Sequence, residues 1–308
     1  MPQNDVYLRC LVSQEEHMNK VSYSQYTTWA NCPESWKLKY VDGHRIDDGS
    51  IHTIFGSAMH EVIQEWMENY LYVGKEKQAA SIDLDESLKV KFHEHFKKSI
   101  KEVDGQKVFP SDRKTLEEFY YQGTEILSYV QKHQEKLFPT KHVKLLGIEF
   151  PIDVEVRPGV NYVGYVDILT RNERTGLITI YDLKTSRSGW TQNQKSDKTK
   201  ISQLLLYKKF IADHFGVPLE MIRVEYIILK RTIMENSPYP IPRVSPFEPP
   251  HGKPSVNRAW SDFEAFLNDC FDETGTYKTD TIKHKASKTN CRWCAFRDRS
   301  DLCKYGVK

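Results

Sequence analysis

Acidic and basic side chains near the ends of two predicted strands are the most chemically suggestive feature of the sequence. Asp182 and Lys184 alternate with apolar residues in segment 176–186, so a strand would project both from one face. Asp167 continues a similar alternation in segment 163–169, and a hairpin would bring it opposite Asp182. Two carboxylates sit close together only when a cation lies between them, and hard oxygen ligands favour Mg²⁺ or Mn²⁺. This spacing predicts metal-dependent phosphodiester cleavage.

These residues belong to a series of four short motifs. A helical G-x-x-x-H, a strand G-x-x-D, D-x-K and a helical Q-x-x-x-Y follow one another, and the last pair shares one helix face because its members are four residues apart. D-x-K alone is common on surface strands, whereas the four motifs in this order are a specific signal. The motifs are Gly56–His60, Gly164–Asp167, Asp182–Lys184 and Gln203–Tyr207. The set resembles the PD-(D/E)XK nuclease superfamily, specifically its RecB-like branch, and the resemblance spans most of the chain.

The resemblance implies a role for each of these side chains. The metal ligands would be His60, Asp167, Asp182 and the carbonyl of Leu183. Lys184 would position the attacking water and offset negative charge on the phosphate. Gln203 and Tyr207 would orient the lysine or the DNA strand. Glu149, on the strand before, either faces the metal or is a solvated edge carboxylate.

The segment Arg187–Lys200 combines basic residues with an aromatic ring next to the expected site. Such a loop suits contact with phosphates and stacking against one base. A flexible, solvated loop is the alternative. The residues expected to bind DNA are Trp190, Lys195, Lys198 and Lys200.

The cysteines form a second candidate metal site. Cys291 and Cys294 make a C-x₂-C pair, Cys303 follows, and a four-coordinate site needs one more ligand. The segment around Cys32 and Pro33 looks like the opening of the AddB-type and CRISPR-associated nucleases, in which this cysteine binds a 4Fe–4S cluster. Zinc is the alternative, because eight residues separate Cys294 from Cys303 where that family has fewer. Cys32 as a small buried hydrophobe and Cys10 as a replacement ligand also stay open.

Composition sets limits on the class of protein. The 308 residues are 39% hydrophobic and 28% charged, as in globular proteins, and could bury a full core. A net charge of +2 excludes a uniformly basic nucleic-acid coat, so DNA contacts must be local. No apolar run reaches membrane-spanning length and the N-terminus lacks the build of a signal peptide, which predicts a cytoplasmic protein without membrane partners. Most of the six cysteines are then ligands or buried thiols rather than disulfides.

Apolar periodicity predicts the elements that must position these residues. Ser22 is expected to cap a helix with a break at Cys32-Pro33, and Thr199 to cap the helix that Gly216 ends. Residues 1–20 are expected to be a loose arm and 237–254 a proline-rich loop. The predicted helices are 22–41, 55–73, two within 83–138, 199–215 and 256–271, and the predicted strands are 145–156, 160–170, 177–184 and 222–230.

The expected fold is α/β, a restriction-endonuclease-like core with a central mixed sheet flanked by helices. We expect residues 1–308 to form one nuclease domain, with a helical insertion at 75–138 and the catalytic sheet and helix at 145–231. The cysteine segment 278–308 would close onto Cys32, so that an iron–sulfur staple joins the termini.

The resulting functional hypothesis is a Mg²⁺- or Mn²⁺-dependent deoxyribonuclease, an exonuclease acting on single-stranded DNA ends in recombination, repair or end-processing. Without a phosphate-binding loop in the sequence, it would work alone or beside a separate helicase or a recombination or CRISPR-adaptation protein. The alternative is a DNA-binding subunit of a larger recombination or spacer-acquisition complex, with a structural metal cluster and with cutting that is idle or dependent on a partner.

Overall fold

A six-stranded mixed sheet lies at the centre of this computed structural model, which describes residues 18–44, 49–233, 237–239, 241–278 and 282–307. Hydrogen-bonded neighbours follow the order β1-β5-β6-β7-β8, and β4 pairs along the other edge of β5. The β1–β5 and β6–β7 pairs are parallel, and the other pairs are antiparallel. The strands are β1 (Asn19–Val21), β4 (Val143–Arg157), β5 (Val160–Asn172), β6 (Ile178–Ser186), β7 (Ile222–Lys230) and β8 (Val244–Phe247).

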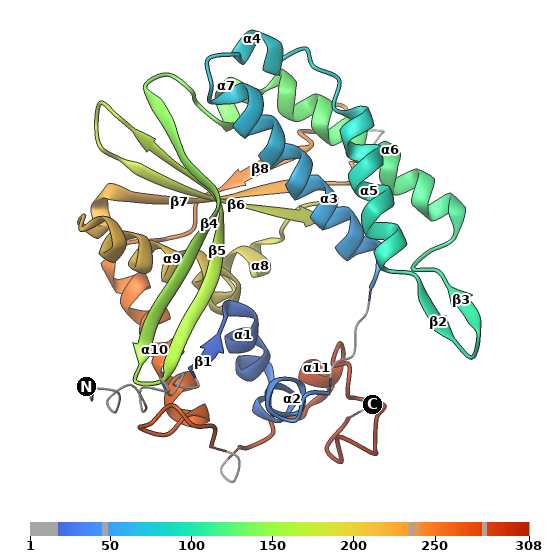
Figure 1. The fold of residues 1–308 in the computed structure, drawn as a ribbon, viewed down its shortest axis with the longest axis vertical. Coiled ribbons are helices and arrows are strands. Elements are labelled where there is room, and N and C mark those ends of the chain that lie inside the picture. The colour runs from blue at the N-terminus through green and yellow to red at the C-terminus, as the bar shows by residue number, and fades with distance from the viewer. Residues whose placement is uncertain (1–17, 45–48, 234–236, 240, 279–281, 308) are drawn as a thin grey trace, which may run out of the picture.

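Helices cover both faces of this sheet. Figure 1 shows α3, α5 and α6 on one side and α9 and α10 on the other, with α1, α2 and α11 close together beyond the sheet. The helices are α1 (Tyr23–Asn31), α2 (Pro33–Trp36), α3 (Ile51–Trp66), α4 (Glu76–Ala79), α5 (Asp85–Lys98), α6 (Arg113–Lys132), α7 (Gln134–Leu137), α8 (Gln192–Ser196), α9 (Lys198–Phe215), α10 (Lys253–Cys270) and α11 (Lys288–Cys291). Two π-helical turns, Lys37–Val41 and Met67–Leu71, extend α2 and α3, and a 3₁₀ turn, Leu219–Met221, precedes β7.

The side chains on the two faces of the central strands pack into two separate apolar cores. On β6, Ile180 packs in the core shared with α9 and α10, whereas its neighbour Tyr181 packs in the core shared with α3 and α6. On β7, Ile228 and Leu229 divide in the same way. Strands buried on both faces read as continuous apolar runs, which explains the unbroken hydrophobicity of segment 226–229.

The edge of β5 that faces β6 is interrupted. β1 pairs with residues 160–162 of this edge, and β6 pairs with residues 168–171. Residues 163–167 lie between these two ladders, while β4 continues along the opposite edge. The sheet therefore forks just before Ile168, and polar side chains lie there on β6 beyond Tyr181 and on the stretch of β5 between the two ladders.

The long elements agree with the sequence predictions. All four predicted strands coincide with β4, β5, β6 and β7 to within a few residues. Ser22 caps α1 by accepting a hydrogen bond from the amide of Gln25, and the helix is interrupted at Cys32-Pro33 as expected. Gly216 ends α9 in a left-handed conformation, with φ of 62°.

Several shorter predictions were wrong. Asn19–Val21 is a strand that overlaps the end of the expected arm, and Val244–Phe247 is a strand within the expected proline-rich loop. The expected helical insertion contains the hairpin β2 (Lys101–Val103) and β3 (Gln106–Val108). Asp197, not Thr199, caps α9, and the loop before it forms α8. Strands of three or four residues are too short to show alternation, so their pairing comes from neighbours distant in the sequence. The rest of the expected arm, residues 1–17, lies outside the described ranges.

Two glycines with positive φ offer a matched test of how the C-terminal segment docks on the sheet. A Cβ on Gly159, in the β4–β5 turn, would lie 2.5 Å from the carbonyl oxygen of Thr274, whereas a Cβ on Gly216 would meet nothing within 4 Å. Both alanine variants incur roughly 1–2 kcal/mol of left-handed backbone strain. We expect Gly159→Ala to lose clearly more unfolding free energy than Gly216→Ala in urea titrations. Equal losses would contradict the close backbone contact.

Candidate active site

Asp167 and Asp182 meet at the fork of the sheet. The β5–β6 ladder ends at the pair Ile168 and Tyr181, and the two aspartates are the next residues on each strand. The amide of Leu183 donates a hydrogen bond of 2.7 Å to Oδ2 of Asp167, which fixes this carboxylate against the backbone beside Asp182. The structure thus brings together the two carboxylates that the sequence predicted to converge.

Lys184 supplies the positive charge next to them. Its Nζ lies 2.7 Å from Oδ2 of Asp182, a carboxylate that is only 1% exposed. Neither oxygen of Asp182 has a hydrogen-bond partner of good geometry among the described residues, so the ion pair is its main electrostatic support. A buried carboxylate with vacant lone pairs is costly unless a cation satisfies them.

Burial dominates the protonation behaviour of this pair. It raises the pKa of Asp167 to about 6, against the opposing effects of the Lys184 charge and the Leu183 amide. It likewise raises the pKa of Asp182 to about 6, opposed by Lys184 and reinforced by the charge of Asp167. Burial alone would lower the pKa of Lys184, but the charges of Asp182 and Asp167 outweigh it and the pKa lies above its ordinary value. Each charge in the cluster depends on the others.

Helix α3 reaches the fork from one side through residues four apart. A Cβ on Gly56 would lie 3.5 Å from Oγ1 of Thr185, so the helix runs close to the end of β6. Nδ1 of His60 lies 3.5 Å from Oδ2 of Asp167. Burial and the charge of Lys184 lower the pKa of His60, which favours the neutral imidazole that a metal requires. The structure thus places His60 of the G-x-x-x-H motif beside the carboxylates, and its role as a metal ligand stays a prediction.

Glu149 and Gln64 extend the polar cluster. The side-chain amide of Gln64, buried on α3, donates to Oε1 of Glu149 at 2.5 Å and to the carbonyl oxygen of Asp167 at 3.2 Å. Glu149 has a φ of 46°, and its charge contributes to raising the pKa of Asp167. The structure therefore favours the interpretation in which Glu149 faces the site. Gln64 was not predicted, although its position four residues after His60 would have placed it on the same helix face.

Helix α9 approaches the fork from the other side. A Cβ on Gly164 would lie 3.1 Å from the hydroxyl of Tyr207, so a larger residue at this strand position would crowd the tyrosine. Gln203 donates a hydrogen bond of 3.3 Å to that hydroxyl. Burial raises the pKa of Tyr207 to about 12, with the hydrogen bond from Gln203 opposing and the charges of Asp182 and Asp167 contributing. The G-x-x-D and Q-x-x-x-Y motifs thus interlock through Gly164 and Tyr207.

Two further tyrosines close the N-terminal end of α9 and were missed by the sequence analysis. Tyr23 donates to the carbonyl of Thr199 at 2.8 Å, and Tyr226 donates to the carbonyl of Lys200 at 2.9 Å. Burial raises the pKa of both hydroxyls, and the charge of Asp182 adds to it. Their distance from the motifs along the sequence left no signal of this role.

The side chains expected to bind DNA are only partly exposed to solvent. Trp190 is half-buried, with its ring centroid 4.8 Å from Tyr226 and Nζ of Lys200 at 4.9 Å from its own centroid. Nζ of Lys195 lies 5.3 Å from the ring of Phe247, and Lys198 is exposed at the start of α9. Stacking of a base on Trp190 stays a prediction, and it would require Lys200 to move from the ring.

The expected cysteine site lies where α1, α2 and α11 meet. A small cavity is lined by residues that include all four predicted ligands, Cys32, Cys291, Cys294 and Cys303. Burial raises the pKa of the Cys303 thiol, and the neighbouring Cys294 and Cys32 add to it. Asn31 donates to the carbonyl of Asn290 at 3.1 Å, so the first helix and the C-terminal segment are also in direct contact. Cys10 lies outside the described residues.

The donor chemistry at the fork suits a hard divalent ion. Asp182 offers two buried oxygens without hydrogen-bond partners among the described residues, and Asp167 lies beside it. Across the described ranges, however, no three His, Cys, Asp or Glu side chains converge closely enough to form a ready-made metal site. At the fork, one oxygen of Asp182 is paired with the Lys184 ammonium at 2.7 Å, so an ion that binds there would have to displace it. The leucine of D-x-K contacts Asp167 through its amide, and the role of its carbonyl stays a prediction.

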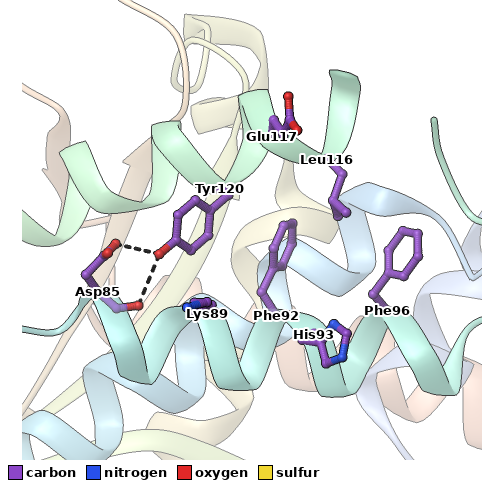
Figure 2. A pocket seen from close by; sticks show the side chains of 8 residues that line it. All are labelled: Asp85, Lys89, Phe92, His93, Phe96, Leu116, Glu117 and Tyr120. Carbon is purple, nitrogen blue, oxygen red and sulfur yellow. Dashed lines mark hydrogen bonds between the residues drawn. The ribbon is translucent and has the colours of Figure 1, made fainter. Parts of the chain in front are cut away.

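A pocket of about 420 Å³ lies elsewhere, between α5 and α6, and shares no residue with the motifs (Figure 2). Its apolar lining includes Phe92, Phe96 and Leu116, and the hydroxyl of Tyr120 donates to Asp85 at 2.7 Å. Its charged residues are exposed and paired elsewhere, Lys89 with Glu86 and Glu117 with Arg113, so they do not form a buried cluster like that at the fork.

Comparison with known families agrees with the geometry. A family model described as the PD-(D/E)XK nuclease superfamily matches residues 20–299. The chain therefore belongs to the PD-(D/E)XK nuclease superfamily, whose members are hydrolases that use divalent metals such as Mg²⁺ and Mn²⁺. No curated protein matches the chain. None of the helices in the described ranges is long and apolar enough to cross a membrane.

The raised pKa of Asp182 gives a stability prediction with a definite sign. Its pKa is about 6 in the folded protein and 3.8 in a free side chain, so the ionised form destabilises the metal-free fold above pH 6. That cost, roughly 3 kcal/mol, disappears as the pH falls from 6 to below 3.8. We expect Asp182→Asn, a neutral isostere, to raise the Tm of the metal-free protein by several degrees at pH 8 and by little near pH 3.5. A lower Tm at pH 8 would contradict this electrostatic account.

Proposed function

We propose that this protein is a Mg²⁺- or Mn²⁺-dependent deoxyribonuclease, acting as an exonuclease on single-stranded DNA ends. The observation that carries the proposal is the buried pair Asp167 and Asp182 with the Lys184 ammonium 2.7 Å from the second carboxylate. A structural ion pair would not need a second buried carboxylate beside it, because the extra negative charge destabilises the fold. In phosphodiester hydrolysis both carboxylates have a function, because together they bind the divalent ion.

The chain's own residues divide the work as follows. Asp167 and Asp182, with His60 and the carbonyl of Leu183, would hold the ion. When bound, the ion lowers the pKa of a water and neutralises charge on the scissile phosphate. Lys184, released from its ion pair with Asp182, positions the attacking water and offsets charge on the phosphate oxygens. Gln203 donates a hydrogen bond to the Tyr207 hydroxyl, and together these two side chains orient the lysine or the DNA strand.

The substrate class follows from the superfamily and the local charges. Three lysines near the fork would contact the phosphate backbone of DNA: Lys195, Lys198 and Lys200. Such contacts suit DNA that is recognised by its phosphates rather than its bases. The preference for single-stranded ends, and recombination, repair or end-processing as the setting, follow from resemblance to the RecB-like and CRISPR-associated enzymes. A separate helicase or a recombination or CRISPR-adaptation protein would be the partner.

The cysteine cavity supports a second part of the proposal, a 4Fe–4S cluster held by Cys32, Cys291, Cys294 and Cys303. The four thiols line one cavity, and soft thiolate donors suit such a cluster or, as the alternative, a zinc ion. Within the described ranges they do not yet converge to ligand distance, so binding would require them to draw together. Bound there, the metal would tie α1 to the C-terminal segment and stabilise the fold.

Cleavage assays with end-labelled single-stranded DNA test the catalytic assignment. We expect the wild-type protein to release nucleotides with Mg²⁺ or Mn²⁺ but not with EDTA, and Asp167→Ala or Asp182→Ala to release none. Lys184→Ala should keep Mn²⁺ binding while its turnover falls roughly 100- to 1,000-fold, because it removes charge stabilisation only. Asp213→Ala, an exposed carboxylate paired with Lys209 on α9, serves as the control with unchanged activity.

An Asp182→Ala protein that cuts at the wild-type rate would refute the assignment. DNA binding without release would favour the DNA-binding module, and activity restored by an added protein would identify a partner-dependent subunit.

Metal analysis of protein purified without oxygen tests the cysteine assignment. We expect brown protein with iron and acid-labile sulfide, and we expect Cys32→Ala to lose both and to melt at a lower temperature. Cys270→Ala is the control, because Cys270 is fully buried in the core among aromatic rings and should retain the metal. Colourless wild-type protein containing zinc would replace the cluster with the alternative metal, and metal-free protein would exclude both.

A further inference from the structure

Lys230 is a cation whose ammonium has no counter-ion in the part of the chain that the structure describes. It ends β7, is only 7% exposed and makes no hydrogen bond or ion pair through its ammonium within the described ranges. Its stem packs against Gly189, where a Cβ would lie 3.1 Å from Cδ of the lysine. The ammonium itself is not fully buried, so packing fixes the stem while the charged end stays accessible to water and to an anion.

The position of Lys230 relates it to the fork. In the parallel β6–β7 ladder, Asp182 is the neighbour of Tyr226 and Lys184 of Ile228, and Ser186 is the neighbour of Lys230. Tyr226 and Ile228 pack in the core on the α9 side, so the alternation of β7 directs Lys230 to that same face. Four strand positions separate Asp182 from Ser186, a distance of roughly 13 Å. An anion held by Lys230 is therefore separate from one held at the aspartates, but on the same side of the sheet.

The surroundings of Lys230 are basic. Burial lowers its pKa, and the positive charge of Lys195 lowers it further. Lys200 lies over the ring of Trp190 in the same connection between β6 and α9. The carboxylate in this connection, Asp197, is engaged in capping α9 by accepting hydrogen bonds from the amides of Thr199 and Lys200. Positive charge thus accumulates along the path that leads from the fork to the end of β7.

We propose that Lys230, together with Lys195, forms a subsite for a backbone phosphate that neighbours the scissile one on the same DNA strand, one or two nucleotides away. The two ammonium groups would donate hydrogen bonds to the non-bridging oxygens of one phosphodiester and so offset its single negative charge. This deepens the proposed nuclease function and rests on it. Lys230 is a binding residue that positions the strand so that the scissile phosphate lies at Asp167 and Asp182.

Binding measurements test the subsite without requiring cleavage. We expect Lys230→Met to bind a single-stranded 20-mer in EDTA about 3- to 10-fold more weakly than wild type, and the slope of log K against log salt to decrease by about 0.7, the value for one lost phosphate contact. Lys230→Arg should restore most of the affinity. Lys209→Met, which removes a lysine paired with Asp213 on α9, should match wild type. An unchanged slope and affinity in Lys230→Met would overturn the subsite.

A kinetic comparison separates a phosphate subsite from a structural or catalytic role. Thymidine 5′-(p-nitrophenyl phosphate) has a single phosphodiester and no neighbouring phosphate, so Lys230→Met should hydrolyse it within twofold of wild type. On the 20-mer the same variant should show a several-fold higher KM. Equal losses on both substrates would overturn the proposal, because the lysine would then act on the fold or on the scissile phosphate. If wild-type protein failed to bind DNA, the nuclease proposal would fall; if only the variants failed to differ, the subsite alone would fall.

Discussion

Two carboxylates at the fork must both be ionised to work, and the interior of the protein opposes their ionisation. Asp182 is 1% exposed and the side chain of Asp167 is 13% exposed, and burial raises the pKa of each to about 6. Lys184 provides the opposing charge within the chain, at 2.7 Å from Asp182. The metal-free fold therefore stores an electrostatic strain that a divalent cation would relieve, and this requirement explains why a lysine lies two residues from the buried aspartate.

The remaining structure serves to hold this cluster in place. The split of β5 between β1 and β6 leaves residues 163–167 without a ladder on one edge, and helices from both faces of the sheet reach the opening. Helix α3 packs beside the end of β6 at Gly56, and Gly164 allows Tyr207 of α9 to approach β5. Glycine in the G-x-x-D motif is thus explained by a close contact rather than by a turn. His60 and Gln64 enter from one core and Gln203 and Tyr207 from the other, so neither half of the site forms without the sheet.

The sequence was sufficient for the long strands, for the convergence of Asp167 and Asp182 and for the pairing of Gln203 with Tyr207, because each follows from a local period. It was insufficient for β1 and β8, because these short segments become strands only by pairing with β5 and β7, which are distant in the sequence. Glu149 was ambiguous because a φ of 46° breaks the alternation that would have assigned its face. Tyr23, Tyr226 and Lys230 depend on contacts between distant segments, which no local pattern encodes.

The most direct measurement of the central claim is anomalous scattering from crystals of the wild-type protein soaked in Mn²⁺. The account predicts a peak within bonding distance of carboxylate oxygens from both Asp167 and Asp182, with Nζ of Lys184 moved away from the second aspartate. A Lys184–Asp182 ion pair that persists in saturating Mn²⁺, with the anomalous peak elsewhere on the molecule or absent, would contradict it.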